Sequence, residues 1–359
     1  MKVPFFNLKY TNHLIDEDLK KIYSRLNDFT YVGGEEISLF EKQFADYIRI
    51  NHAISCANGT DALEIVLRAL NLTSTDEVIV PALTCFATVE AIINAGGKPI
   101  FVDVNPDCYT LDSKHLLSAI TPKTKAIIPV HLYGQTADMK SILKIANKIP
   151  VIEDCSHAHG LWVEKHHVGT RSTAGIFSFY PTKNLGALGD AGIITTNNKI
   201  LAEKCRILAN HGQKEKDIHV SIGKNSRMDT VQAAILSAKL KHLDHLTKER
   251  RKNAEQYYQQ LSSAIKVPFK DSNHVFHQFV IQAERRNDLI NYLNSQGIAT
   301  AIHYPYAVNT FHFFHEGTHQ KTCPVAENLV KNILSLPIYP GISTQQIARV
   351  SKEINKFYR

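Results

Sequence analysis

Short apolar runs rich in branched residues alternate with helical patterns along the chain from Ala57 onward. Strands of this kind are buried on both faces of a parallel sheet, so the alternation predicts an α/β fold in which helices cover a sheet. The helices are expected between the runs, over residues 61–70, 87–95 and 138–148. The strands are expected over residues 77–81, 98–104, 125–131, 150–154, 174–180 and 192–196.

The pattern changes after the last of these strands. Over residues 228–263 apolar positions recur at helical spacing for longer than one average helix, which predicts a long connecting helix or a broken pair of helices. A smaller α+β unit is predicted beyond it, from a strand and two helices over residues 275–282, 286–296 and 344–358. We therefore expect a large domain with an N-terminal arm over residues 1–240 and a small domain over residues 241–359.

The charge balance and the cysteines limit the partners. The net charge is +7, from 41 basic against 34 acidic residues, so an anionic ligand is attracted more easily than a cationic one. No segment resembles a nucleic-acid-binding module, and none approaches the roughly 20 consecutive apolar residues of a membrane span. Six scattered cysteines without a Cys-x-x-Cys pair, and an N-terminus without a secretory signal, predict reduced thiols and a cytoplasmic location.

The first candidate site is a small, polar segment over residues 55–63 that runs directly into a predicted helix. Free amides at the start of a helix bind anions, and a glycine lets another backbone approach closely. Gly59 and Thr60 are therefore candidate ligands of a phosphate. A simpler interpretation is that Asn58 or Thr60 only caps the helix.

A predicted strand ends in two carboxylates, Glu153 and Asp154. Ligands of open α/β sheets gather at the carboxyl ends of strands, so one of the two is expected to be functional. His157 and His159 follow, and on a continued strand both imidazoles would share a face and could ligate a metal. No complete set of spaced ligands is found elsewhere in the sequence, so we expect no metal.

Lys183 lies in a Gly-bounded loop after a strand that runs out at Tyr180. A lysine desolvated by aromatic neighbours has a lowered pKa and can attack a carbonyl. Ser178, on the same strand, can donate a hydrogen bond to a phosphate. A phosphate cup, a strand-end carboxylate and a loop lysine are together what pyridoxal 5'-phosphate (PLP) requires: a Schiff-base lysine, a carboxylate that keeps the ring nitrogen protonated, and phosphate donors.

Seven motifs extend this pattern along the chain: NGTDAL (58–63), DEVIVP (76–81), IPVHLYGQ (128–135), IED (152–154), FSFYPTKNLGALG (177–189), NSRMD (225–229) and LSLP (334–337). Together they resemble the fold-type I, PLP-dependent sugar aminotransferases of the DegT/DnrJ/EryC1/StrS family, over almost the whole chain. The resemblance implies a large three-layer α/β/α domain with a mixed, mostly parallel sheet, followed by a smaller α+β domain.

For the cofactor ring, the resemblance implies that Lys183 forms the Schiff base and that Asp154 pairs with the pyridine nitrogen. It also implies that His157 lies by the ring and its phenolic oxygen. The family commonly has an aromatic residue that stacks on the ring where this chain has Cys85 followed by Phe86. Either the Cys85 sulfur packs on the ring or Phe86 partly substitutes for the aromatic residue.

For the phosphate, the resemblance implies contacts from Gly59, Thr60 and Ser178. Asn225 is implied to reach the phosphate from a neighbouring subunit, which makes the active site a property of a homodimer. Candidate sugar contacts from the corresponding family segments are Tyr31, Tyr180, His211 and Tyr304.

The residues around Lys183 are typical of family members that aminate C3 of nucleotide-linked 3-keto sugars. The family's deoxygenating dehydratases replace this lysine with histidine, so its presence indicates transamination. The expected reaction takes the amino group of L-glutamate, leaving 2-oxoglutarate, to a dTDP-3-keto-6-deoxyhexose. The product, a dTDP-3-amino-3,6-dideoxyhexose, would serve a surface polysaccharide such as the O-antigen or another glycan.

Other functions remain open at this point. The acceptor could be C4 of a dTDP-, UDP- or GDP-linked 4-keto sugar, or C3 of a UDP sugar. A non-catalytic PLP-binding regulator is a further alternative, although no DNA-binding module precedes the predicted sheet. A nucleotide-binding oxidoreductase should have a Gly-x-Gly-x-x-Gly turn after its first strand, and the sequence contains none.

Overall fold

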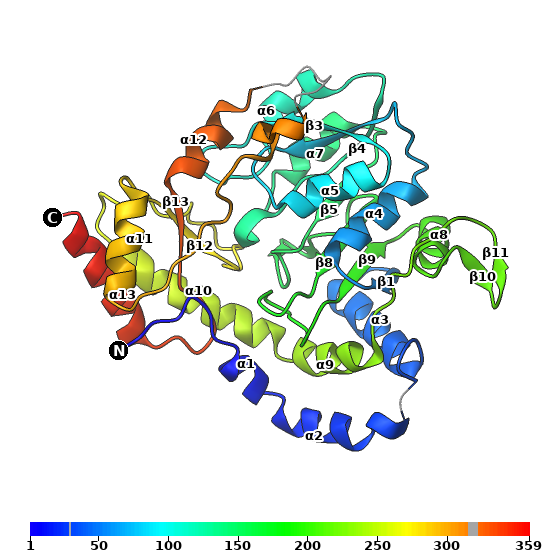
Figure 1. Ribbon diagram of the computed structural model, residues 1–359, viewed down its shortest axis with the longest axis horizontal. Helices are drawn as coiled ribbons and strands as arrows, with labels where there is room; N and C mark the ends of the chain where they lie inside the picture. Colours follow the sequence, from blue (N-terminus) through cyan, green and yellow to red (C-terminus); the bar gives the residue numbers. More distant parts are fainter. Residues whose placement is uncertain (29, 315–321) are drawn as a thin grey trace.

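The computed structural model describes residues 1–28, 30–314 and 322–359 (Figure 1). The chain begins with an arm that lies along the outside of the molecule and leads into the first long helix. The arm and this helix comprise α1 (Lys9–His13), α2 (Asp16–Ser24), the 3-10 turn η1 (Leu26–Asp28) and α3 (Glu35–Ile48).

Seven strands build the central sheet: β1 (His52–Cys56), β2 (Glu77–Pro81), β3 (Lys98–Val102), β4 (Thr124–Ile127), β5 (Ile152–Asp154), β8 (Ala174–Ser178) and β9 (Gly192–Thr196). Their order is β3-β2-β4-β5-β8-β9-β1, in which parallel bridges between β4 and β5 join two hydrogen-bonded groups. The ladders of β2 with β3 and β4, and of β5 with β8, are parallel. β9 is antiparallel to both neighbours, so the mixed, mostly parallel sheet is confirmed.

Helices cover both faces because successive side chains of a strand point to opposite sides. Val78 and Val80 pack in the core of one face, whereas Ile79 between them packs in the core of the other. Ile176 and Phe177 divide in the same way. The first face is covered by α4 (Gly59–Ala69), α5 (Phe86–Asn94) and α8 (Lys199–Ala209). The second is covered by α3, α6 (Ser113–Leu116), α7 (Met139–Ala146) and α9 (Thr230–Leu240).

The long helical pattern after residue 228 is a broken pair, α9 followed by α10 (Leu243–Gln260). Beyond it, β12 (Phe279–Gln282) pairs antiparallel with β13 (Ile333–Leu336). Tyr257 of α10 and Phe279 belong to a separate apolar core around this pair. The helices α11 (Arg286–Ser295) and α13 (Thr344–Phe357) pack in this core, whereas the buried side chains of α12 (Pro324–Asn332) pack in the core on the first face of the central sheet.

Short elements complete the described chain. They are β6 (Trp162–Val163), β7 (His166–His167), β10 (Gln213–Glu215), β11 (Ile218–His219), η2 (Leu117–Ala119), η3 (Leu132–Gly134), η4 (Val308–Thr310) and η5 (His312–Phe314). All six cysteines are free thiols. Across the described ranges, no helix combines the length and the apolarity needed to span a membrane.

Candidate active site

A cavity of about 290 Å³ lies where the carboxyl ends of β5 and β8 meet the N-terminus of α4. Nine residues singled out from the sequence line it: Gly59, Thr60, Cys85, Asp154, His157, Ser178, Tyr180, Lys183 and Tyr304. The cavity also contains polar residues that sequence reasoning missed, namely Thr84, Thr88, Ser156 and Asp190. The sheet thus collects the predicted groups at one edge, as the strand-end argument expects.

The start of α4 forms one wall of the cavity. The side-chain oxygen of Asn58 accepts a hydrogen bond from the Asp61 amide at 2.8 Å and caps the helix. The Gly59 and Thr60 amides come before it in the first turn, where a helix offers no carbonyl partner, so they can serve an anion. A Cβ atom on Gly59 would lie 2.7 Å from Ser178 Cβ, so glycine is what allows α4 to approach the end of β8.

Asp154 lies at the end of β5 and is 5% exposed. Its Oδ1 accepts from the amide of Ser156 at 3.1 Å, and its Oδ2 accepts from Thr88 Oγ1 at 3.0 Å. Each carboxylate oxygen therefore keeps a lone pair for a further donor from the cavity. Sequence reasoning missed Thr88 because it lies on α5 and meets Asp154 only through the folded sheet.

Lys183 lies in the loop after β8, and its amide donates to Tyr180 O at 2.8 Å. Burial lowers the pKa of the Lys183 amine to about 8, although the nearby Cys85 and Asp154 offset part of this shift. Lys239 of α9 fixes the loop by donating from Nζ to a loop carbonyl, Gly186 O, at 2.9 Å. The loop therefore holds a partly desolvated amine at the cavity.

His157 presents a hydrogen-bond donor to the cavity. The Tyr133 amide donates to His157 Nδ1 at 3.2 Å, so the proton of the neutral ring lies on Nε2. Burial lowers the pKa of His157 well below its ordinary value, and the charge of Lys183 acts in the same direction. The ring of His277 packs against it with 4.3 Å between ring centres.

His159 does not share the position of His157. Its ring lies 5.5 Å from the rings of both Phe177 and Phe179, in the aromatic core on the far side of the sheet. The two imidazoles of the His-x-His motif therefore lie in different places, one at the cavity and one in the aromatic core, so they do not share a face at which both could bind one metal ion.

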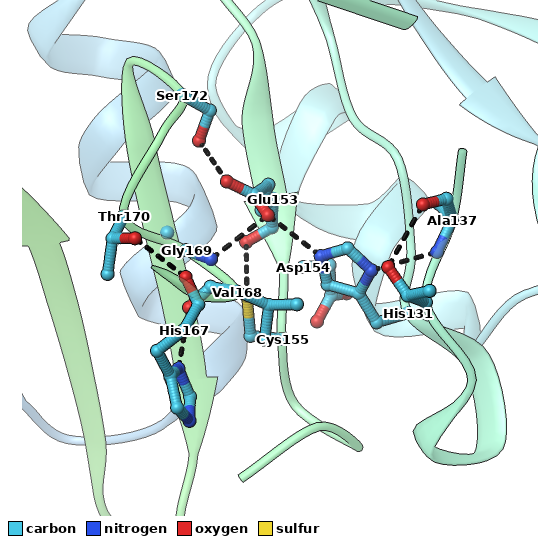
Figure 2. Close-up of polar contacts among 12 residues, drawn as sticks. His131, Ala137, Glu153, Asp154, Cys155, His167, Val168, Gly169, Thr170 and Ser172 are labelled. Carbon is cyan, nitrogen blue, oxygen red and sulfur yellow. Dashed lines mark hydrogen bonds and ion pairs between the residues drawn. The ribbon is translucent and has the colours of Figure 1, made fainter. Parts of the chain in front are cut away.

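Glu153 does not line the cavity, and its carboxylate lies in a buried hydrogen-bond network (Figure 2). Its carboxylate accepts from His131 Nε2 at 2.9 Å, from the Gly169 amide at 2.9 Å and from Ser172 Oγ at 2.6 Å. His131 Nδ1 in turn accepts from the Ala137 amide at 3.1 Å. Burial acts to raise the pKa of Glu153, but the donors outweigh it and leave the pKa below its ordinary value.

Together with Cys155, His131 and Glu153 place potential metal-ligand atoms within 4.8 Å of one another. The imidazole and carboxylate atoms of this cluster already have hydrogen-bond partners, and the Cys155 thiol lies 3.6 Å from the Glu153 carbonyl. Burial raises the pKa of Cys155 well above its ordinary value, which keeps the thiol protonated and a poor ligand. We interpret the cluster as a hydrogen-bond network that braces the end of β5.

Four other residues singled out from the sequence lie outside the cavity: Phe86, Asn225, His211 and Tyr31. Phe86 begins α5 and makes an edge-to-face contact with Phe311 at 5.5 Å, so of the two candidates for a ring contact only Cys85 lines the cavity. Asn225, His211 and Tyr31 are exposed on the surface of the single chain.

The cavity fits PLP. An amine with a lowered pKa, a carboxylate with free lone pairs and an imidazole N–H surround it, and the start of α4 closes tightly on Ser178 beside them. These are groups that can hold a carbonyl carbon, a ring nitrogen, a phenolic oxygen and a phosphate.

A model of the DegT/DnrJ/EryC1/StrS aminotransferase family matches residues 12–355. A pleiotropic regulatory protein of Geobacillus stearothermophilus is 42% identical to the chain, and the match covers 100% of this chain and 99% of the relative. A UDP-N-acetyl-3-dehydro-alpha-D-glucosamine 3-aminotransferase of Acidithiobacillus ferrooxidans is also 42% identical, over 96% of this chain and 94% of the relative.

A dTDP-3-amino-3,6-dideoxy-alpha-D-galactopyranose transaminase of Aneurinibacillus thermoaerophilus is 40% identical, with 99% of each chain covered. Among solved structures, that of DesV from S. venezuelae in complex with a ketimine intermediate matches with a TM-score of 0.95 and 37% identity. That match covers 99% of this chain and 98% of the other.

Proposed function

Because the chain belongs to the DegT/DnrJ/EryC1/StrS aminotransferase family, we propose that it moves the amino group of L-glutamate to C3 of a dTDP-3-keto-6-deoxyhexose. The product would be a dTDP-3-amino-3,6-dideoxyhexose. Two relatives support C3, because one is named for a 3-aminotransferase and the other for a 3-amino sugar. They differ in the nucleotide, UDP in one and dTDP in the other, so a UDP-linked 3-keto sugar is the second candidate.

PLP, on which this family depends, supplies an electron-withdrawing ring and a carbon that carries the amino group between the two substrates. Lys183 is the proposed attachment point and proton carrier. With a pKa of about 8, about a tenth of its amine is neutral at pH 7, so Nζ could take a proton from the donor carbon that loses the amino group and, in the second half of the reaction, give a proton to the acceptor carbon that gains it.

Asp154 and His157 orient the ring in this proposal. The free lone pairs of the Asp154 carboxylate would accept a hydrogen bond from the protonated ring nitrogen, which would keep the proton on the ring and the ring electron-poor. His157 would donate a hydrogen bond from Nε2 to the phenolic oxygen of the ring. Cys85, which lines the cavity, would pack its sulfur against the ring.

The phosphate would bind at the start of α4, to Gly59, Thr60 and Ser178. Asn225 is exposed on the single chain, which agrees with its reaching the phosphate of a second subunit in a homodimer. Tyr180 and Tyr304 line the cavity and are the proposed sugar contacts of the same chain. Tyr31 and His211 would meet the sugar only across the subunit interface.

We further propose that residues 1–240 hold the cofactor and that residues 241–359 close over the sugar, since Tyr304 lies in the second part. The surplus of basic residues suits the diphosphate of the nucleotide sugar.

The observation that carries the proposal is that Lys183 and Asp154 line one cavity together with the start of α4. The test is turnover of a panel of dTDP- and UDP-linked 3-keto and 4-keto sugars with L-glutamate, followed by detection of 2-oxoglutarate and the amino sugar. Lys183→Ala should abolish transfer, whereas Lys241→Ala, an exposed lysine at the end of α9, should not. Reaction of 4-keto sugars alone would overturn the C3 assignment.

The name of the Geobacillus relative keeps a regulatory function as the alternative. A protein that binds PLP but forms no 2-oxoglutarate with any sugar of the panel would favour it.

A further inference from the structure

A chain of two threonine hydroxyls leads to the carboxylate of Asp154. Thr88 Oγ1 donates to Asp154 Oδ2 at 3.0 Å, and Thr84 Oγ1 lies 3.1 Å from Thr88 Oγ1. Both threonine side chains are 1% exposed, so bulk water does not compete for these contacts. Both residues nevertheless line the cavity.

The chemistry of the groups sets the direction of this chain. A hydroxyl carries one proton, and an ionised carboxylate only accepts. Because the one hydroxyl proton of Thr88 is donated in the hydrogen bond to Asp154, the Thr88 oxygen accepts the hydrogen bond that Thr84 donates. The hydrogen bonds therefore run from Thr84 to Thr88 to Asp154, and each donor polarises the next.

The hydrogen bonds from Thr84 and Thr88 also fix the position of the Asp154 carboxylate. Thr88 lies in the first turn of α5, and Thr84 lies just before the residue that caps that helix. The amide of Ser156 holds the other carboxylate oxygen at 3.1 Å. Asp154 is therefore held by α5 on one oxygen and by its own turn on the other, which sets the plane of the carboxylate.

We propose that Thr88, supported by Thr84, is a positioning residue that keeps the free lone pairs of Asp154 aimed at the cofactor ring nitrogen. The inference rests on the proposed function, in which Asp154 pairs with that nitrogen. Without the Thr88 hydroxyl the carboxylate can rotate about its side-chain bonds and loses its fixed plane. The ring nitrogen is then less firmly protonated and the ring withdraws fewer electrons.

The test is PLP binding to the apoenzyme of full-length variants, with no sugar present. Thr88→Val removes the hydroxyl but keeps the shape, and it should weaken PLP binding about tenfold. It should also raise the pH midpoint of the visible band of the bound cofactor, because a less electron-poor ring makes the Lys183 nitrogen more basic. Thr88→Ser keeps the hydroxyl, so its PLP affinity should stay within about threefold of wild type and its pH midpoint should match that of wild type.

Thr196→Val is the matched control for loss of a buried hydroxyl. Thr196 is 1% exposed and donates to Thr173 O at 2.8 Å, in β9 and outside the cavity. This variant should lower the melting temperature of the apoenzyme and leave the PLP affinity and the pH midpoint unchanged. The comparison separates positioning of Asp154 from a general loss of stability.

The inference is overturned if Thr88→Val loses stability as Thr196→Val does but binds PLP with wild-type affinity and midpoint. If Thr88→Val does not fold, Thr84→Val decides, since it leaves the bond to Asp154 in place. Thr84→Val should weaken PLP binding about threefold. An unchanged PLP affinity and an unchanged pH midpoint of the visible band would count against the support that Thr84 gives to Thr88. Failure of the wild-type protein to bind PLP would refute the proposed function itself.

Discussion

Replacing Glu153 with Gln tests the network that braces β5 behind the cavity. The carboxylate accepts from His131, Gly169 and Ser172, and the proton of His131 must lie on Nε2 because Nδ1 accepts from Ala137 (Figure 2). An amide offers one oxygen and one NH2 group to the same three donors. The NH2 group can face Ser172, whose hydroxyl can turn its proton to the Ala174 carbonyl at 3.0 Å. All three contacts then involve a neutral amide in place of a charged carboxylate, inside a site that is 2% exposed.

The magnitude follows from these contacts. A hydrogen bond to a charged group contributes about 1.5–3 kcal/mol and one between neutral groups about 0.5–1.5 kcal/mol, so loss of the charge weakens each of the three hydrogen bonds by about 1 kcal/mol. We expect the Gln variant to lose about 3 kcal/mol of unfolding free energy. An unfolding entropy of about 2.1 cal/mol/K per residue gives about 0.75 kcal/mol/K for the chain, so the melting temperature should fall by about 4 °C.

The same carboxylate makes stability depend on pH. Its pKa is lower in the folded chain than in the unfolded chain, so its contribution is present above the unfolded pKa and disappears as the pH falls through the folded pKa. The gap between wild type and Glu153→Gln should therefore be widest at pH 7 and shrink in acid.

The assay is calorimetry of the two apoenzymes at pH 7 and at pH 4, with Glu203→Gln as the control. Glu203 is 62% exposed and its carboxylate lies 4.0 Å from Lys199 Nζ, so its loss should change stability by less than about 0.5 kcal/mol. If Glu153→Gln melts within about 1 °C of wild type at pH 7, the network does not brace the sheet and our reasoning fails.

Three further predictions follow from single contacts. The rate at which the apoenzyme captures PLP should rise with pH and level off above about 8, because the neutral Lys183 amine is the reactive form; a rise continuing towards pH 10.5 would contradict the lowered pKa. Gly59→Ala should weaken PLP binding about tenfold and lower the melting temperature, because it places a methyl group 2.7 Å from Ser178 Cβ. Adding Ser178→Gly should restore part of the lost stability, as measured by calorimetry. Ser343→Ala removes the capping box of α13 and should cost about 1 kcal/mol in chemical denaturation, with no change in PLP affinity.

The strand predictions are correct where apolar runs end at turns and are wrong where a proline interrupts the backbone hydrogen bonds of a run. Residues 77–81 and 192–196 match β2 and β9 to the residue. The strand expected over residues 125–131 ends already at Ile127, the last residue of β4. It ends there because Pro129 has no amide to donate to a ladder. The antiparallel direction of β9 has no local signal, since it depends on which strands lie beside it.

The candidate site shows the same division. Asp154, Lys183 and Gly59 could be found because each lies at a strand end, a loop or a helix start that the sequence predicts. Thr88 could not, because its contact with Asp154 joins helix and strand across 66 positions and a buried threonine has no distinctive pattern. The choice between Cys85 and Phe86 depends on the rotation of α5 at its first residue, which only the packed structure fixes.

The cavity draws its walls from segments as far apart in the chain as Gly59 and Tyr304. A ligand of such a cavity binds the folded protein and not the unfolded one, so a hundredfold excess over its dissociation constant adds about 2.7 kcal/mol of stability. Newly made chains that lack PLP open more often and are degraded sooner. The amount of this protein in a cell should therefore follow the supply of PLP, without any dedicated sensor.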